Sequence, residues 1–278
     1  MRADLHTHTH HSDGERSPID LVRKAKEAGL DVVAVTDHNS VDGVEEALRA
    51  GKRYGVRVIP AVEILTREGE VNGYFIDHTS KKLRKELARY QARMHETTRR
   101  LATSLRRQGH DISLRQLDEE FPHSRKNRHV GHLIHHLYRQ GHRSREEIVD
   151  IIRQADITKP RVKDLSAVTA IRTIKRYGGV AVLNHPWLST DALKEKNIKR
   201  YVKAGLQGVE LENGDEDRFG RTKKIVKRIL RVSRKYGLVV TQGSDYHGEA
   251  ITALSGGHQL GKFYCSEDVV DELERRAT

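Results

Sequence analysis

The chain has 278 residues, which is within range for a single α/β barrel, and it contains no apolar run long enough to span a membrane. The single cysteine, Cys265, excludes an intramolecular disulfide framework, and its strand-like surroundings predict burial. The polar N-terminus shows no apolar signal segment, so we expect a cytoplasmic protein with no membrane partner. The net charge of +12 favours an anionic partner, although a basic solvated surface would give the same count.

Strand and helix patterns alternate from the start of the sequence. A short strand is expected over Arg2–His6, and it leads into a cluster of histidines. Ser17, Pro18 and Asp20 have the form of a helix start, because serine caps a helix and proline suits its first position. The continuous apolar run Val32–Val35 predicts a buried parallel strand. A helix over 41–54 and a strand over 56–62 follow.

The alternation returns in the last third of the chain. Helices are expected over 165–177, 193–204 and 221–236, and strands over 179–183, 208–211 and 238–241. Polar residues able to bind metals follow each of these strands. Since the carboxyl ends of parallel barrel strands meet at one face, the pattern predicts an α/β barrel with its active site there.

A long basic segment interrupts this alternation. After an extra strand over 70–77, residues 79–162 are mostly helical in character and carry 20 Lys and Arg against 10 Asp and Glu, a net of +10. We expect them to form an insertion that caps the barrel mouth, between barrel segments 1–78 and 163–278. The charge favours a phosphorylated substrate or nucleic acid, with a basic solvated face as the alternative.

Histidines and carboxylates gather at the ends of the expected strands. His6 and His8 point to the same face of a strand, because side chains alternate with a period of two. The candidate metal ligands are His6, His8, Asp13, His38, Glu63, His185, Asp245 and His247. Nitrogen and oxygen ligands without cysteine suit Zn²⁺, Mn²⁺ or Fe²⁺. Eight ligands suit two or three ions that share a carboxylate and act on a phosphoryl group, although any one histidine could be a polar core residue.

Five segments resemble, in order, the motifs of the PHP (polymerase and histidinol phosphatase) family. They are Asp4-Leu5-His6-Thr7-His8 with Ser12-Asp13-Gly14, Thr36-Asp37-His38, Val62-Glu63-Ile64, Asn184-His185-Pro186 and Gly243-Ser244-Asp245-Tyr246-His247. The resemblance implies a distorted (β/α)7 barrel of PHP type, a trinuclear metal site and phosphoesterase chemistry. The mostly helical insertion resembles that of short, stand-alone PHP phosphoesterases, which act on nucleoside 3′,5′-bisphosphates or on the 5′ ends of short oligonucleotides.

The same resemblance implies how the ligands are shared among the ions. The first ion would be held by His6, His8, Glu63 and Asp245, the second by Asp13, His38 and His247, and the third in part by Glu63 and His185.

One stretch departs from the family pattern. This branch usually has a histidine in a stretch like Glu-Val-His-Ile-Leu-Gly-Tyr-Phe-Ile-Asp, whereas residues 70–77 read Glu-Val-Asn-Gly-Tyr-Phe-Ile-Asp. We place Asn72 at the position of that histidine. Because an amide is a poor ligand for Zn²⁺ or Mn²⁺, we expect a weakened third site, or substitution by His78 from farther along.

The insertion contains a segment that resembles a family Gly-Arg-Pro-His at a helix start. His129 fits the place of the histidine, and Arg128 lies one position out of step with the arginine. We expect both to bind substrate phosphate, since a guanidinium offers a bidentate fork and helix-start amides bind anions. Alternatively, the histidines of this segment line a helix that packs or faces water.

These patterns together predict a metal-dependent phosphoesterase. Its substrate would be a phosphomonoester of a nucleotide-like molecule, for example a nucleoside 3′,5′-bisphosphate, and metal-activated water would hydrolyse it. The alternatives are a 5′→3′ exonuclease on short RNA or DNA, a histidinol phosphatase, and a non-catalytic metal-binding module that docks nucleic acid or protein.

Overall fold

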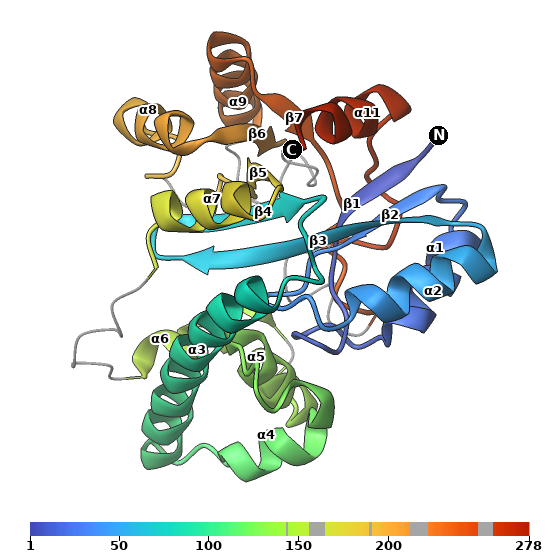
Figure 1. Ribbon diagram of the computed structural model, residues 1–278. Coiled ribbons are helices and arrows are strands. Elements are labelled where there is room, and N and C mark those ends of the chain that lie inside the picture. Colours follow the sequence, from blue (N-terminus) through green and yellow to red (C-terminus); the bar gives the residue numbers. More distant parts are fainter. Residues whose placement is uncertain (143, 156–164, 189–190, 212–221, 250–257, 278) are drawn as a thin grey trace.

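A curled sheet of seven strands forms the centre of the computed structural model, which describes residues 1–142, 144–155, 165–188, 191–211, 222–249 and 258–277 (Figure 1). The strands lie in chain order and are β1 (Ala3–Thr7), β2 (Val32–Val35), β3 (Arg57–Thr66), β4 (Gly69–Tyr74), β5 (Val180–Leu183), β6 (Leu206–Glu210) and β7 (Val239–Thr241). Strands β1, β2 and β5 are buried along their whole length, and for β2 the continuous apolar run predicts this burial.

One strand runs against the others. β1 to β3 pair in parallel, as do β5 to β7, but β4 is antiparallel to both β3 and β5. Only Arg67 and Glu68 connect β3 to β4. Since a parallel strand needs a long crossover connection, a turn this short allows only an antiparallel hairpin. The predicted distorted α/β barrel is therefore confirmed, with β4 as the reversed strand.

The sheet curls until its first and last parts meet. Thr7 at the end of β1 bridges Tyr246, which follows β7, and Ala3 bridges Cys265. The Asp4 carboxylate reinforces this closure, since it accepts hydrogen bonds from the backbone N–H groups of Ser244 and Gly261, both at 2.9 Å. Cys265 is buried as expected. The strand ends therefore surround a common mouth.

Helices cover the outside of the sheet. They are α1 (Pro18–Glu27), α2 (Val44–Tyr54), α7 (Ala167–Arg176), α8 (Glu195–Ala204), α9 (Thr222–Tyr236) and α11 (Glu267–Arg276). The Ser17 side chain caps α1 by accepting from the Asp20 N–H at 3.1 Å, and α2 ends at Gly55 in the left-handed conformation. Leu21 of α1 packs in one cluster with Val33 of β2, so the apolar helix face is buried on the sheet.

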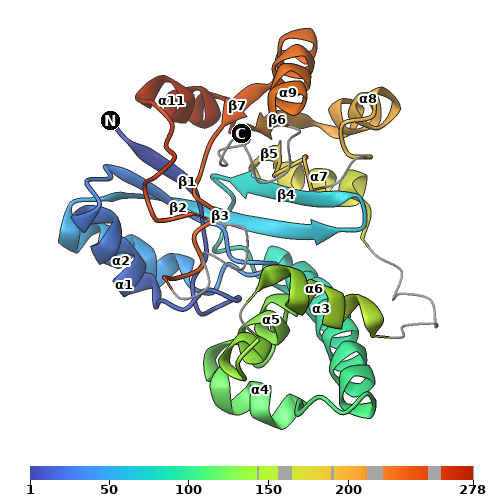
Figure 2. The same ribbon diagram turned by 180° about the vertical axis from the view of Figure 1, so that it is seen from behind.

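The remaining helices gather on one side of the sheet, below it in both views (Figures 1 and 2). They are α3 (Lys81–Arg107), α4 (Leu114–Glu120), the short 3-10 turn η1 (Pro122–Ser124), α5 (Val130–Arg139) and α6 (Arg145–Gln154). They share a hydrophobic cluster of their own that includes Leu105, Leu137 and Ile148. No helix in the described part of the chain is both long and apolar enough to cross a membrane.

This helical unit closes over the mouth. The Asn127 side chain donates hydrogen bonds to the carbonyl groups of His11 at 2.9 Å and His38 at 2.6 Å, both in loops that follow barrel strands. The cap predicted for the insertion is therefore in place. Its boundaries at residues 79 and 162 stay a prediction, because residues 156–164 lie outside the described part.

Candidate metal centre

The strand after the N-terminus and the loop after the last strand meet at the Glu63 carboxylate. His6 Nε2 lies 3.3 Å from Glu63 Oε2, and His8 Nε2 lies at the same distance from this oxygen. Asp245 Oδ1 is 3.3 Å from His6 Nε2 and 3.2 Å from His8 Nε2. The imidazoles of β1 and of the residue after it therefore each lie beside two carboxylates, one from β3 and one from the chain after β7.

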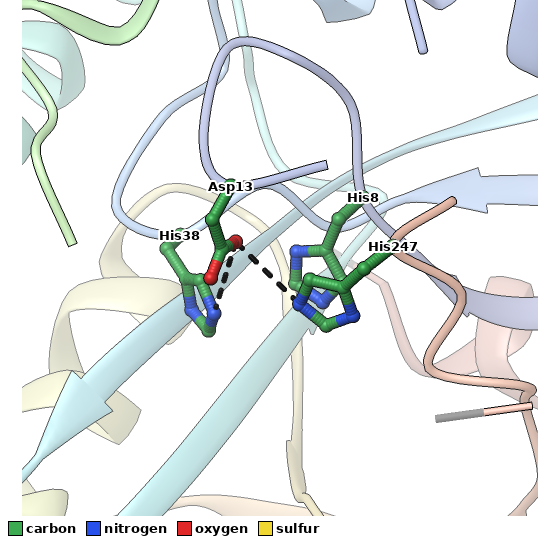
Figure 3. Close-up of side chains that lie close together, drawn as sticks. All are labelled: His8, Asp13, His38 and His247. Atoms are coloured by element: carbon green, nitrogen blue, oxygen red, sulfur yellow. Dashed lines mark ion pairs between the residues drawn. The ribbon is translucent and has the colours of Figure 1, made fainter. Parts of the chain in front are cut away.

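A second group lies beside the first and shares His8 with it (Figure 3). Asp13 Oδ1 lies 3.6 Å from His38 Nε2 and 3.5 Å from His247 Nε2. The rings of His8 and His247 stack with their centres 4.1 Å apart. One ligand atom from each of these four residues lies within 4.8 Å of the others, which is compatible with a single ion.

A third group contains a residue that the sequence analysis did not select. His185 Nε2 lies 3.2 Å from Glu63 Oε1 and 2.8 Å from an oxygen of Glu70, at the start of β4. Glu63 is thus a member of two groups, through its two oxygens. The structure brings together all eight candidate ligands and adds Glu70 to them.

The chemistry of these groups fits divalent cations. Five buried atoms have no hydrogen-bond partner and lie in these groups: His6 Nε2, His8 Nε2, Asp13 Oδ1, His38 Nδ1 and Glu63 Oε2. An unpaired buried polar atom costs about 1–3 kcal/mol. Cations would satisfy these atoms together, because nitrogen and oxygen donors of this kind are the ligands that Zn²⁺, Mn²⁺ and Fe²⁺ take.

Charges within the centre keep the carboxylates ionised. Burial alone would raise the pKa of Glu63, but the neighbouring His6 and His38 hold that pKa well below its usual range. Burial would likewise lower the pKa of His247, but the charges of Asp13 and Asp245 raise this pKa to about 10. The carboxylates therefore remain negatively charged and available to cations near neutral pH.

Two carboxylates outside the centre hold its residues in place. The Asp37 carboxylate accepts hydrogen bonds from Thr9 N–H at 2.7 Å and Ser12 Oγ at 2.7 Å, which anchors the loop between His8 and Asp13. Asp37 is part of the Thr-Asp-His motif, but the sequence analysis gave it no role. Only its position directly before the candidate ligand His38 indicates a role for Asp37 in the sequence.

Glu210 is the second of these carboxylates. Its Oε1 lies 3.0 Å from His6 Nδ1, and its Oε2 accepts from the His185 backbone N–H at 2.8 Å. It thereby orients one ligand of the first group and one of the third. Glu210 is the last residue of β6, inside the strand expected over 208–211, so the rule that functional residues follow barrel strands did not identify it.

The backbone is strained at the same place. Asp245 has φ 52° and His185 has φ 20°, while Asn39, next to His38, has φ 50°. A non-glycine residue in the left-handed region costs about 1–3 kcal/mol and persists where its surroundings enforce it. These residues therefore hold their side chains at the mouth against a local conformational preference.

The expectation about Asn72 is wrong. Its side chain is buried deeper in the barrel and donates to the Tyr74 hydroxyl at 3.0 Å. Because β4 is antiparallel, its earlier residue Glu70 lies nearer the mouth than Asn72 does, about 7 Å from it along the strand. The family stretch ends like Gly73–Asp77, and its histidine lies three residues before the glycine, at the position of Glu70. His78 does not substitute, since it contacts Glu45 instead, at 3.4 Å.

The two candidate substrate-binding residues lie in different surroundings. His129 Nδ1 is 2.7 Å from Asp13 Oδ2, so His129 faces the centre from the start of α5. The side chain of Arg128 is buried and contacts Asp118 of α4, while its Nε and Nη1 atoms have no partner. The structure thus brings His129 to the ligands and pairs Arg128 within the helical unit.

A curled sheet with four overlapping His and carboxylate groups at its mouth, the fourth formed by His38, Glu70 and His129, defines a metal-dependent hydrolase site. The model of the PHP domain family matches residues 4–240, and the chain belongs to this family. The predicted family is therefore confirmed, and with it the predicted class of enzyme, a metal-dependent phosphoesterase.

Two relatives and a solved structure match this chain over nearly its full length. The chain is 28% identical over 282 residues to a 5′-3′ exoribonuclease of Haemophilus influenzae, covering 97% of this chain and 96% of the relative. It is 27% identical over 287 residues to a 3′,5′-nucleoside bisphosphate phosphatase of Chromobacterium violaceum, covering 98% and 96%. A crystal structure from Bifidobacterium adolescentis shares the fold, with a TM-score of 0.86, 24% identity and coverage of 99% of this chain and 96% of the other.

Proposed function

We propose that this protein hydrolyses a phosphomonoester of a nucleotide-like substrate, with a nucleoside 3′,5′-bisphosphate as the leading example. The observation that supports this proposal best is the convergence of unpartnered ligand atoms at the mouth of the barrel. Two relatives of similar identity act on nucleic-acid components, according to their names. A small phosphorylated substrate from this class is therefore the best candidate.

The proposed cofactors are two or three divalent ions, Mn²⁺, Zn²⁺ or Fe²⁺. The residues that would hold them are His6, His8, Asp13, His38, Glu63, His185, Asp245 and His247. Bound here, the ions would activate a water molecule as the nucleophile and stabilise charge on the phosphoryl oxygens. Glu63 is the shared ligand, since its two oxygens face different groups.

The chain's own residues would position the phosphate. We assign His129 to this role because it faces the centre beside Asp13 and its ring lies 4.2 Å from that of His38, measured between ring centres. Arg128 is the second candidate, since two of its guanidinium nitrogens lack partners and would bind an anionic group if its pairing with Asp118 opened. A variant of His129 should therefore affect catalysis more than a variant of Arg128.

A cavity beside the centre offers room for the rest of the substrate. Its volume is about 590 Å³, within the range of small-molecule sites. Two lining residues, Asn39 and Val130, directly follow His38 and His129 in the chain. Arginines 67, 93 and 153 line the cavity together with apolar residues such as Met94. An apolar group with a second phosphate matches this lining in polarity and charge.

Phosphate release from a nucleoside 3′,5′-bisphosphate tests the proposal. Alanine at His8 or Glu63 should abolish turnover, and full activity of both variants would refute the function. Arg93→Ala should raise KM for the bisphosphate and leave p-nitrophenyl phosphate hydrolysis unchanged. Arg106→Ala serves as the control, since it lies on the same helix but does not line the cavity.

A 5′→3′ exonuclease on short RNA or DNA is the second candidate. The net charge of +10 over residues 79–162 favours it, as does the exoribonuclease relative. Phosphate contacts along an oligonucleotide make the logarithm of its binding constant fall steeply with salt, whereas a small substrate shows a shallow slope. A steep slope with processive shortening of RNA would therefore favour the exonuclease.

Binding of metal without hydrolysis of any phosphoester would favour the non-catalytic alternative.

The cytoplasmic location stays a prediction, and the single cysteine, Cys265, is compatible with it.

A further inference from the structure

We propose that Glu70 is a ligand of the ion held with Glu63 and His185, and that it shifts the preference of this position from Zn²⁺ toward Mn²⁺. The inference rests on the metal centre of the proposed function. It concerns the position that matches the histidine of the family stretch quoted above, so it describes a property of this chain.

The geometry around Glu70 supports a ligand role. Its Oε2 lies 2.8 Å from His185 Nε2, and ligand atoms of Glu63, Glu70 and His185 all lie within 4.8 Å of one another. Glu63 is fully buried, and its Oε1 lies 3.2 Å from the same His185 nitrogen. The carboxylates of Glu70 and Glu63 therefore converge on one imidazole nitrogen, close enough for the three side chains to bind a single cation.

The surroundings keep these donors in place. Glu210 accepts a hydrogen bond from the His185 backbone N–H at 2.8 Å, and the Asn184 side chain donates one to Glu63 Oε1 at 2.6 Å. Glu70 is the second residue of β4 and pairs with Leu65 of β3, and the strand pairs with β5 from Val71 onward. A side chain on such a strand is more precisely placed than one on a loop.

Exchange of an imidazole for a carboxylate changes the ion that the group prefers. Imidazole suits Zn²⁺, whereas carboxylate oxygens suit harder ions such as Mn²⁺ and Mg²⁺. The group formed by Glu63, Glu70 and His185 contains two carboxylates and one imidazole. Its donor set is therefore more anionic and richer in oxygen than the same group with a histidine at residue 70.

Counting bound ions tests the inference without measuring turnover. Wild type, Glu70→Gln and Glu70→His would be equilibrated with Mn²⁺, with Zn²⁺ and with both, and the ions bound per chain would be measured by mass spectrometry. Glu70→Gln should bind one ion fewer than wild type. Glu70→His should recover that ion, with a lower ratio of Mn²⁺ to Zn²⁺.

Glu45→Gln is the matched control, because Glu45 also faces a histidine, His78 at 3.4 Å, but at the surface. An unchanged ion count in Glu70→Gln would overturn the ligand role. The wild-type ratio of Mn²⁺ to Zn²⁺ in Glu70→His would overturn the preference. Thermal unfolding would confirm that each variant is folded. A protein that binds the expected ions but hydrolyses no phosphoester would refute the proposed function and leave this inference intact.

Discussion

Substitution of Gly131 by alanine should damage the metal centre from a helix that contributes no proposed metal ligand. Gly131 is the second residue of α5, and a Cβ atom there would lie 2.0 Å from Asp13 Oδ2 and 2.8 Å from Asp13 Cγ. To reach an ordinary contact near 3.4 Å, the carboxylate must move by about 1.4 Å. Asp13 is buried and short, so it cannot avoid the new methyl group by a remote rotation.

The sizes of the expected losses in activity and stability follow from helix propensity and from the displacement of Asp13. Alanine favours a helix over glycine by at most about 1 kcal/mol, so the fold itself should not be weakened by helix propensity. A displacement of roughly 1 Å in a catalytic group costs about 100-fold in rate. Gly131→Ala should therefore lower kcat by about 100-fold and weaken binding of the ion near Asp13. The steric overlap should cost about 1–3 kcal/mol of stability, which the gain in helix propensity partly offsets.

Calorimetric metal titration together with phosphate release would measure both effects. Arg139→Ala is the control, since Arg139 lies exposed in the last turn of the same helix. Wild-type ion affinity and rate in Gly131→Ala would refute the contact between α5 and Asp13 as the reason for a glycine here.

Two further predictions concern residues outside the ligand set. Glu210→Gln should weaken metal binding or activity by about 10–100-fold, because Glu210 orients His6 and His185. A metal titration equal to that of wild type would exclude this role. Burial raises the pKa of the Cys265 thiol to about 12, so at about pH 8 the group is neutral and should react with a disulfide reagent only after unfolding. Rapid labelling of the folded protein would contradict that burial.

The features that the sequence predicts correctly are those in which a local pattern determines a local structure. The apolar run of β2 was located at its observed bounds, and Ser17 and Gly55 mark the ends of the first two helices. His6 and His8 were placed on one face by the period of a strand, and both contact Glu63. These features depend on short-range geometry, so the sequence alone could predict them.

The misjudged features depend on contacts between distant segments. The prediction for Asn72 is wrong because β4 is antiparallel, which places Glu70 nearer the mouth, and because the family stretch matches this chain from Gly73 onward and not from Glu70. Glu210 lies more than 200 residues from His6, and no local pattern connects them. The contact of Arg128 with Asp118 likewise depends on how α4 packs beside the start of α5.

Restoration of activity by metal after chelation is the most direct test of the central claim. Glu63 Oε2 lies 3.3 Å from His6 and His8 and 3.2 Å from His38, so this carboxylate is needed for more than one ion. Chelated wild type should release no phosphate from a nucleoside 3′,5′-bisphosphate until Mn²⁺ or Zn²⁺ is added, and chelated Glu63→Gln should stay inactive. Full hydrolysis by the chelated wild type, or full recovery of Glu63→Gln, would contradict the account.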